Sequence, residues 1–222
     1  MEAVAVARPS AVARWAFLGG LLYVVLFVIG TIVLFDGPPD TSSAPAKVIA
    51  YYSDSGHRDR VNVGWILIGL AVFFLLWFIG ALRKAVGAVD GEGVLTAVVG
   101  LGGGVYAALA FASVALNQGL RTMSDDTYQH RVFPELIHAA DDVGWVMHAT
   151  GAVGLGAMII AASLAFMRAG AWPKWAGWLG VIVGILALAS VAFFPQFLFL
   201  LWILVVSFVM FRRESSARVT QT

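Results

Sequence analysis

The stretch WAGWLGVIVGILALASVAFFPQFLFLLWILVVSFVMF, residues 175–211, is an apolar run without a single charged residue. A helix needs ~20 apolar residues to cross a bilayer, so this run is nearly long enough for two crossings. Pro195 lies near its middle, and proline lacks an amide hydrogen and clashes with the preceding helical turn. We therefore predict a tight hairpin of two helices, over 175–194 and 196–211, in place of one kinked helix.

Four further apolar segments precede this run, so the predicted fold class is all-α, an integral membrane bundle of six transmembrane helices. Hydrophobic residues make up 60% of the chain and charged residues 12%, which is about half the charged share of a soluble domain. The first segment is too long for the apolar core of a signal peptide, about 7–15 residues. The chain contains no cysteine, which excludes disulfides, thiolate catalysis and cysteine-ligated metals. The four earlier segments are expected at 15–35, 63–82, 94–116 and 143–167.

Basic residues place both chain ends on the cytoplasmic side, because short inner segments of membrane proteins are enriched in Lys and Arg. The chain is then divided into an inner tail over 1–14, a transmembrane domain over 15–211 and a basic inner tail over 212–222. The outer loops of the transmembrane domain cover about 36–62 and 117–142. The basic residues on the inner side are Arg8, Arg14, Arg83, Lys84, Arg168, Lys174, Arg212, Arg213 and Arg218. Those on the outer side are Lys47, Arg58, Arg60, Arg121 and Arg131.

The first outer loop is expected to contain a short interfacial helix. Ser43 is a candidate helix cap, and Pro45 favours a helix start because its missing amide hydrogen has no partner there anyway. Lys47 should point to water while an apolar face lies on the membrane or on protein. That buried face is expected to consist of Val48, Ile49 and Tyr52.

The candidate binding residues fall into two groups. The stretch HAADDVGWVMH, residues 138–148, has helical spacing and no proline, so we predict one helix that starts near Pro134 and enters the membrane. Within an arc of roughly 120° this helix presents the first group of candidates for ligand or partner binding. They are His138, Asp141, Asp142, Trp145 and His148. The first outer loop contributes Tyr51, Tyr52, Asp54, His57 and Arg58.

A metal site is one interpretation of the first group. Asp141 and His148 are about 10 Å apart along a helix axis, so one ion cannot bind both. His138 and Asp142, one turn apart, are the pair that could share an ion. Further ligands would come from His130, His57 or Asp54. The alternative, which we favour, is a solvated acidic helix start that pairs with outer-loop arginines, with no metal, cofactor or catalytic residue.

His148 lies about 7 Å inside its apolar segment, where a polar side chain needs a partner on another helix. Tyr106, Asn117 and Gln118 are the candidate partners. Apart from His148, no ionisable side chain lies inside a predicted span, which argues against ion-coupled transport. Glycines inside the spans, as in GLGGG at 100–104, indicate close helix packing and not a phosphate loop.

Two stretches, AKVIAYYSDSGHRDR (residues 46–60) and AGAWPKWAGWLGVIVG (residues 169–184), resemble a family of small multi-pass bacterial membrane proteins of the actinobacterial type, a domain of unknown function. The resemblance implies a multi-pass protein of the bacterial plasma (inner) membrane. It supplies no catalytic residues.

We expect a non-enzymatic membrane protein, either an accessory or partner-binding subunit or a binder of hydrophobic ligands or lipids. The expected partners are membrane lipid, other membrane proteins or a second copy of the chain, and not nucleic acid. A passive transporter or channel, a lipid-modifying enzyme and an outer-face metal-binding protein remain as alternatives.

Overall fold

The computed structural model describes residues 11–35, 37–40, 42–122, 131–192 and 195–219. Every regular element within these ranges is a helix, and five helices are long and apolar enough to cross a membrane. The α-helices are α1 (Ala11–Phe35), α2 (Pro45–Ser53), α3 (Ser55–Asp90), α4 (Val94–Thr122), α5 (Pro134–Arg168), α6 (Lys174–Ala187) and α7 (Pro195–Val219).

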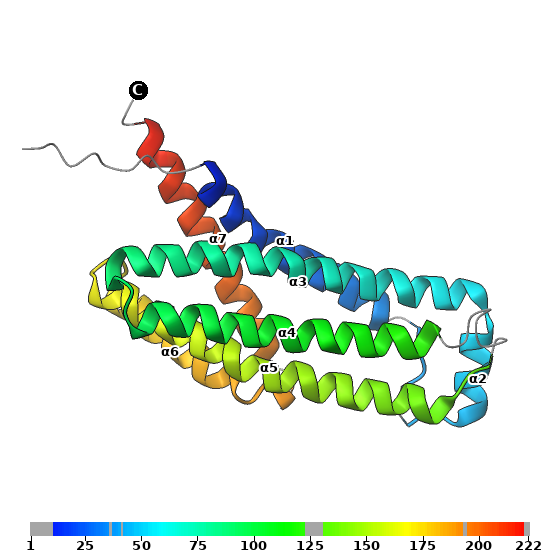
Figure 1. Cartoon of the computed structure of the whole chain (residues 1–222). Helices are drawn as coiled ribbons and strands as arrows, with labels where there is room; N and C mark the ends of the chain where they lie inside the picture. Colours follow the sequence, from blue (N-terminus) through cyan, green and yellow to red (C-terminus); the bar gives the residue numbers. More distant parts are fainter. Residues whose placement is uncertain (1–10, 36, 41, 123–130, 193–194, 220–222) are drawn as a thin grey trace, which may run out of the picture.

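Three long helices, α3, α4 and α5, lie side by side and form the body of the molecule (Figure 1). Helix α1 packs along α3, α6 packs against α5, and α7 crosses the bundle at an angle to meet α1. The start of α1 and the end of α7 therefore lie on the same side, and the short α2 lies at the opposite end (Figure 1). Buried side chains such as Leu75, Phe78, Leu155 and Ile203 form one core between these helices.

Glycines bring neighbouring helices into backbone contact. A Cβ atom added to Gly154 on α5 would lie 2.6 Å from the carbonyl oxygen of Gly102 on α4. A Cβ atom added to Gly156 would lie 2.5 Å from the carbonyl oxygen of Gly184 on α6. Since real Cβ atoms do not approach so closely, only glycine permits these crossings. The prediction that the glycines serve helix packing is confirmed at these positions.

The long apolar run breaks at Pro195 as predicted, but its first helix is shorter than expected. Helix α6 ends at Ala187 and not near residue 194, so it is not among the helices long enough to cross a membrane. The Ser190 hydroxyl donates to the carbonyl of Ala187 at 2.6 Å, which competes with helical hydrogen bonding, and a short 3-10 turn, η2 (Ser190–Ala192), follows. Helix α7 then begins at Pro195, because a proline is tolerated in the first helical turn.

Two helices extend beyond their apolar segments because their starts are fixed by local chemistry. Helix α3 begins at Ser55, and the Asp54 carboxylate accepts a hydrogen bond from the backbone amide of His57 at 2.9 Å. Helix α5 begins at Pro134, so HAADDVGWVMH is part of one continuous helix, as predicted. Helix α3 ends before Gly91, whose φ of 65° is a left-handed conformation that favours glycine.

The short helix α2 buries two of the three side chains expected to be buried. Val48 and Tyr52 are buried against α3 and α5 in a small cluster that includes Ile137, and Lys47 is exposed. Ile49 is 44% exposed on the protein surface, so it is not buried against protein, and its contact with lipid stays a prediction. Val48 and Tyr52 lie one turn apart on one face, whereas Ile49 is rotated by about 100° from Val48.

The prediction that Ser43 caps α2 was wrong. The N-cap residue is Ala44, and the hydroxyl of Ser43 donates instead to the carboxylate of Asp40 at 3.0 Å. The hydroxyl of Ser42 donates to the same oxygen at 2.8 Å. These hydrogen bonds hold the pKa of Asp40 below its usual value, because they favour the charged carboxylate. The loop before α2 is thus organised around an acid and not around a helix cap.

Candidate functional site

His148 takes part in a chain of polar side chains that joins three helices. Its Nε2 atom on α5 lies 3.4 Å from the hydroxyl of Tyr106 on α4. That hydroxyl is 2.8 Å from the hydroxyl of Tyr23 on α1, and both tyrosines are fully buried. The predicted pairing of His148 with Tyr106 is confirmed, and Tyr23 extends it to a third helix.

Aromatic rings fix the orientation of the His148 imidazole. Phe27 of α1 stacks on it with ring centroids 5.7 Å apart and planes 21° apart, and Trp145 stacks at 6.3 Å and 23°. The Tyr106 ring meets it edge-on at 5.4 Å. A ring held from three directions has little rotational freedom, so one imidazole edge is presented steadily to the space beside it.

That space is a cavity of ≈ 220 Å³ among α1, α3, α4, α5 and the first turn of α7. Its walls are mostly apolar and include Phe27, Leu34, Ile68 and Val72. Phe35, the last residue of α1, also lines it and is 71% exposed, so the cavity reaches the surface beside the end of α1. Small-molecule sites have this character, an apolar hollow with a few polar groups at defined places.

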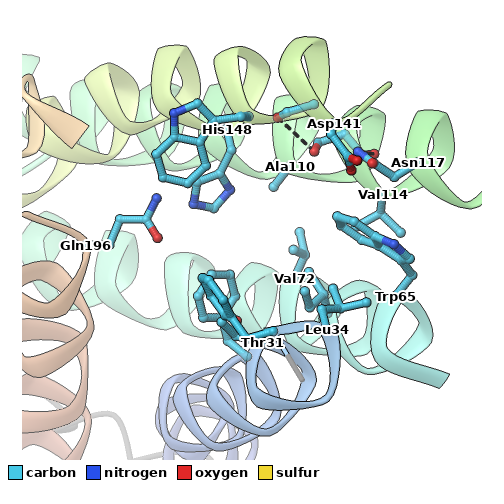
Figure 2. A pocket seen from close by; sticks show the side chains of 16 residues that line it. Thr31, Leu34, Trp65, Val72, Ala110, Val114, Asn117, Asp141, His148 and Gln196 are labelled. Atoms are coloured by element: carbon cyan, nitrogen blue, oxygen red, sulfur yellow. Dashed lines mark hydrogen bonds between the residues drawn. The ribbon is translucent and has the colours of Figure 1, made fainter. Parts of the chain in front are cut away.

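Gln196 supplies one of these polar groups. It is the second residue of α7, its side chain is only 4% exposed, and its Nε2 atom is buried without a hydrogen-bond partner among the described residues. Figure 2 shows its amide beside the imidazole of His148, both directed into the cavity. A buried amide that lacks a partner costs about 1–3 kcal/mol, which an acceptor atom on a ligand would offset.

The other polar end of the cavity lies toward the start of α5. Asp141 and Asn117 line it there, on the side of the view away from Gln196 (Figure 2). The Asn117 amide donates to the carbonyl of Ser113 at 3.0 Å, and the Ser113 hydroxyl donates to the carbonyl of Gly144 at 2.9 Å. The second bond joins α4 to α5 at this end of the cavity.

Only three of the five residues in the first group of candidates line the cavity. Asp141, Trp145 and His148 line it, whereas His138 and Asp142 do not. Asp142 is exposed, and His138 is half-buried with its Nε2 atom enclosed and unpartnered among the described residues. No group of three or more His, Asp or Glu side chains that could hold a metal occurs in the described part of the chain. His130, a candidate metal ligand, lies outside the described residues.

The second group of candidates forms a corner between α2 and α3, apart from the cavity. The His57 ring stacks on the Tyr51 ring at 4.2 Å with planes 3° apart, and its Nδ1 atom lies 3.3 Å from the carbonyl of Tyr51. Asp54 caps α3, and the Arg58 guanidinium donates to the carbonyl of Tyr52 at 2.8 Å. These contacts stiffen the corner. The pairing of the α5 acids with outer-loop arginines stays a prediction.

Gln196 was not among the predicted site residues, although its place in the sequence carries a signal. In the run 175–211 it is the only residue with an amide side chain, and it follows the proline that breaks the run. A polar side chain at such a break is enclosed by neighbouring helices and faces them or a cavity. No protein-family model, curated protein or solved structure matches this chain, so the resemblance to a bacterial membrane-protein family stays a prediction.

Proposed function

We propose that this chain is a non-enzymatic, multi-pass protein of the bacterial plasma membrane that binds a small amphipathic molecule in the cavity beside His148. The observation that carries the proposal is the enclosed Nε2 atom of Gln196, which has no hydrogen-bond partner among the described residues and faces an apolar hollow. A ligand with an apolar body would fill the hollow, and one hydrogen-bond acceptor on it would pair with the Gln196 amide. The apolar walls supply affinity, and the polar end selects orientation.

The size of the cavity restricts the ligand. An apolar cavity of about 150 Å³ accepts benzene, so ≈ 220 Å³ accommodates roughly nine heavy atoms. That is one ring with a short substituent. A whole phospholipid is far too large, and membrane lipid would instead cover exposed side chains such as Trp175, Leu201 and Phe208.

A six-crossing topology with both ends inside follows if the α6–α7 hairpin crosses the membrane. Gly156 of α5 lies against Gly184 of α6, and His148 of α5 and Gln196 at the start of α7 line one cavity. From Val143 to Arg168 a helix rises roughly 37 Å, which is enough to cross a bilayer core of ~30 Å with His148 inside it. Helix α6, from Lys174 to Ala187, rises about 20 Å of that distance on the way back. The cavity would then lie near the outer face.

The test uses 4-ethylphenol, a neutral probe of about nine heavy atoms, and thermal unfolding of the purified full chain in mild detergent. The probe should raise the melting temperature of the wild type in a saturable way. Gln196→Leu should bind it about tenfold more weakly, because one buried hydrogen bond is lost. Gln118→Leu, whose side chain does not line the cavity, is the matched control and should bind normally. No saturable shift in the wild type, or equal binding by Gln196→Leu, would overturn the proposal.

A further inference from the structure

The end of the cavity opposite Gln196 identifies the second functional group of the ligand. Asp141 is the only Asp, Glu, Lys or Arg among the described residues that line the cavity. Among the described residues that line the cavity there is no Lys or Arg, and the imidazole of His148 lies at the other end, so Asp141 is the acidic group of this end. A ligand that places a positive charge at this end would be attracted, and an anion would be repelled.

An aromatic side chain at the same end suits a cation. Trp65 of α3 lines the cavity together with Asp141, and Figure 2 shows Trp65 and Asn117 on the same side as Asp141. Indole rings attract cations through their faces, and a carboxylate beside them supplies a charge-assisted hydrogen bond.

The distance between the two ends sets the length of the ligand. Asp141 and His148 are seven residues apart on α5, about 10 Å along the helix axis. Between them the walls are aliphatic and include Val72, Ala110 and Val114. A single ring fits this apolar middle, with one polar group reaching each end. Its short chain would carry the cation toward Asp141, and a ring hydroxyl would reach the amide of Gln196.

We propose that the ligand is a small aryl-alkyl ammonium ion with a ring hydroxyl, its ammonium group at Asp141 and its hydroxyl at Gln196. This inference rests on the proposed function, since it assigns the chemistry of the same cavity. The hydroxyl oxygen accepts from Nε2 of Gln196, which has no protein partner among the described residues. The ammonium group contacts the Asp141 carboxylate and lies beside the indole of Trp65.

The test compares three probes that share a 4-hydroxyphenyl ring and differ in the group at the end of the para chain, on the full chain in mild detergent. Tyramine has both polar ends, 4-ethylphenol has the hydroxyl alone, and 3-(4-hydroxyphenyl)propionate replaces the ammonium with a carboxylate. Dissociation constants come from the ligand dependence of thermal unfolding. Tyramine should bind the wild type about tenfold more tightly than 4-ethylphenol, and the propionate should bind more weakly than either.

The variants separate this inference from the proposed function. Asp141→Asn should remove the tyramine advantage and leave 4-ethylphenol binding unchanged. Asp142→Asn, one residue away but exposed and outside the cavity, should keep the advantage. If 4-ethylphenol binds but tyramine binds no better, or if Asp141→Asn keeps the advantage, the ammonium assignment is wrong and the proposed function stands. If none of the probes binds, both are wrong.

Discussion

At the scale of single residues, the Tyr106 hydroxyl is the centre of the polar chain between helices. It lies between the Tyr23 hydroxyl at 2.8 Å and Nε2 of His148 at 3.4 Å. Both tyrosine hydroxyls are buried, so neither finds water when its partner is removed. These three side chains therefore link α1, α4 and α5.

A double-mutant cycle tests this link. Tyr106→Phe should lower the free energy of unfolding by about 1 kcal/mol, because it removes one hydroxyl and strands the buried hydroxyl of Tyr23. Tyr23→Phe should cost less, since the contact between Tyr106 and His148 remains. The double variant should be no less stable than Tyr106→Phe alone, as measured by unfolding in detergent. Fully additive losses would show that the two hydroxyls do not act together.

Residue-level reasoning found one member of the site and missed another for different physical reasons. His148 was identified because its depth in an apolar segment requires a partner, and Tyr106 is at the same depth on a neighbouring helix. Gln196 was missed because its position depends on where α6 ends and how α7 turns back, which is a tertiary property. The division between Asp141 and Asp142 depends on helix rotation, which periodicity gives only to within an arc of roughly 120°.

At the scale of helices, glycine contacts and proline breaks determine the packing. Apolar periodicity and Pro134 predicted α5, and the proline break predicted separate helices α6 and α7. The early end of α6 could not be predicted, because the sequence alone does not show whether a serine hydroxyl bonds to a backbone carbonyl of its own helix. In the structure the Ser190 hydroxyl donates to the carbonyl of Ala187. Likewise, which apolar side chains of α2 are buried against protein, as Val48 and Tyr52 are, depends on how α2 lies against α3 and α5.

Two glycines of α4 provide a matched pair for testing the helix contact. A Cβ atom at Gly102 would collide with the carbonyl oxygen of Gly154, whereas a Cβ atom at Gly104 has no neighbour within 4 Å. Gly102→Ala should therefore destabilise the protein by about 1–3 kcal/mol through overpacking. Gly104→Ala should leave stability unchanged or raise it by up to about 1 kcal/mol, because alanine favours a helix over glycine. Thermal unfolding in detergent measures both, and equal effects would contradict the contact.

At the scale of the whole molecule, the membrane topology determines on which side of the membrane the cavity opens. If the hairpin of α6 and α7 crosses the membrane, the cavity lies near the outer face and its mouth is beside Phe35. The turn between α3 and α4 then lies on the inner side with Arg83 and Lys84. Val94, the first residue of α4, is 75% exposed there. The chain contains no cysteine, so a single introduced thiol can report which side of the membrane each position faces.

The most direct test of this account is labelling of Phe35→Cys with a membrane-impermeant maleimide in intact cells. Phe35→Cys should be labelled from outside, and 4-ethylphenol should slow the labelling because it occupies the cavity that this position lines. The matched variant Val94→Cys should react only after the membrane is permeabilised, at a rate that the probe leaves unchanged. If Val94→Cys is labelled in intact cells and Phe35→Cys is labelled only after permeabilisation, the topology is the opposite of the one proposed. Labelling of Phe35→Cys at a rate that saturating 4-ethylphenol does not alter would contradict the binding cavity.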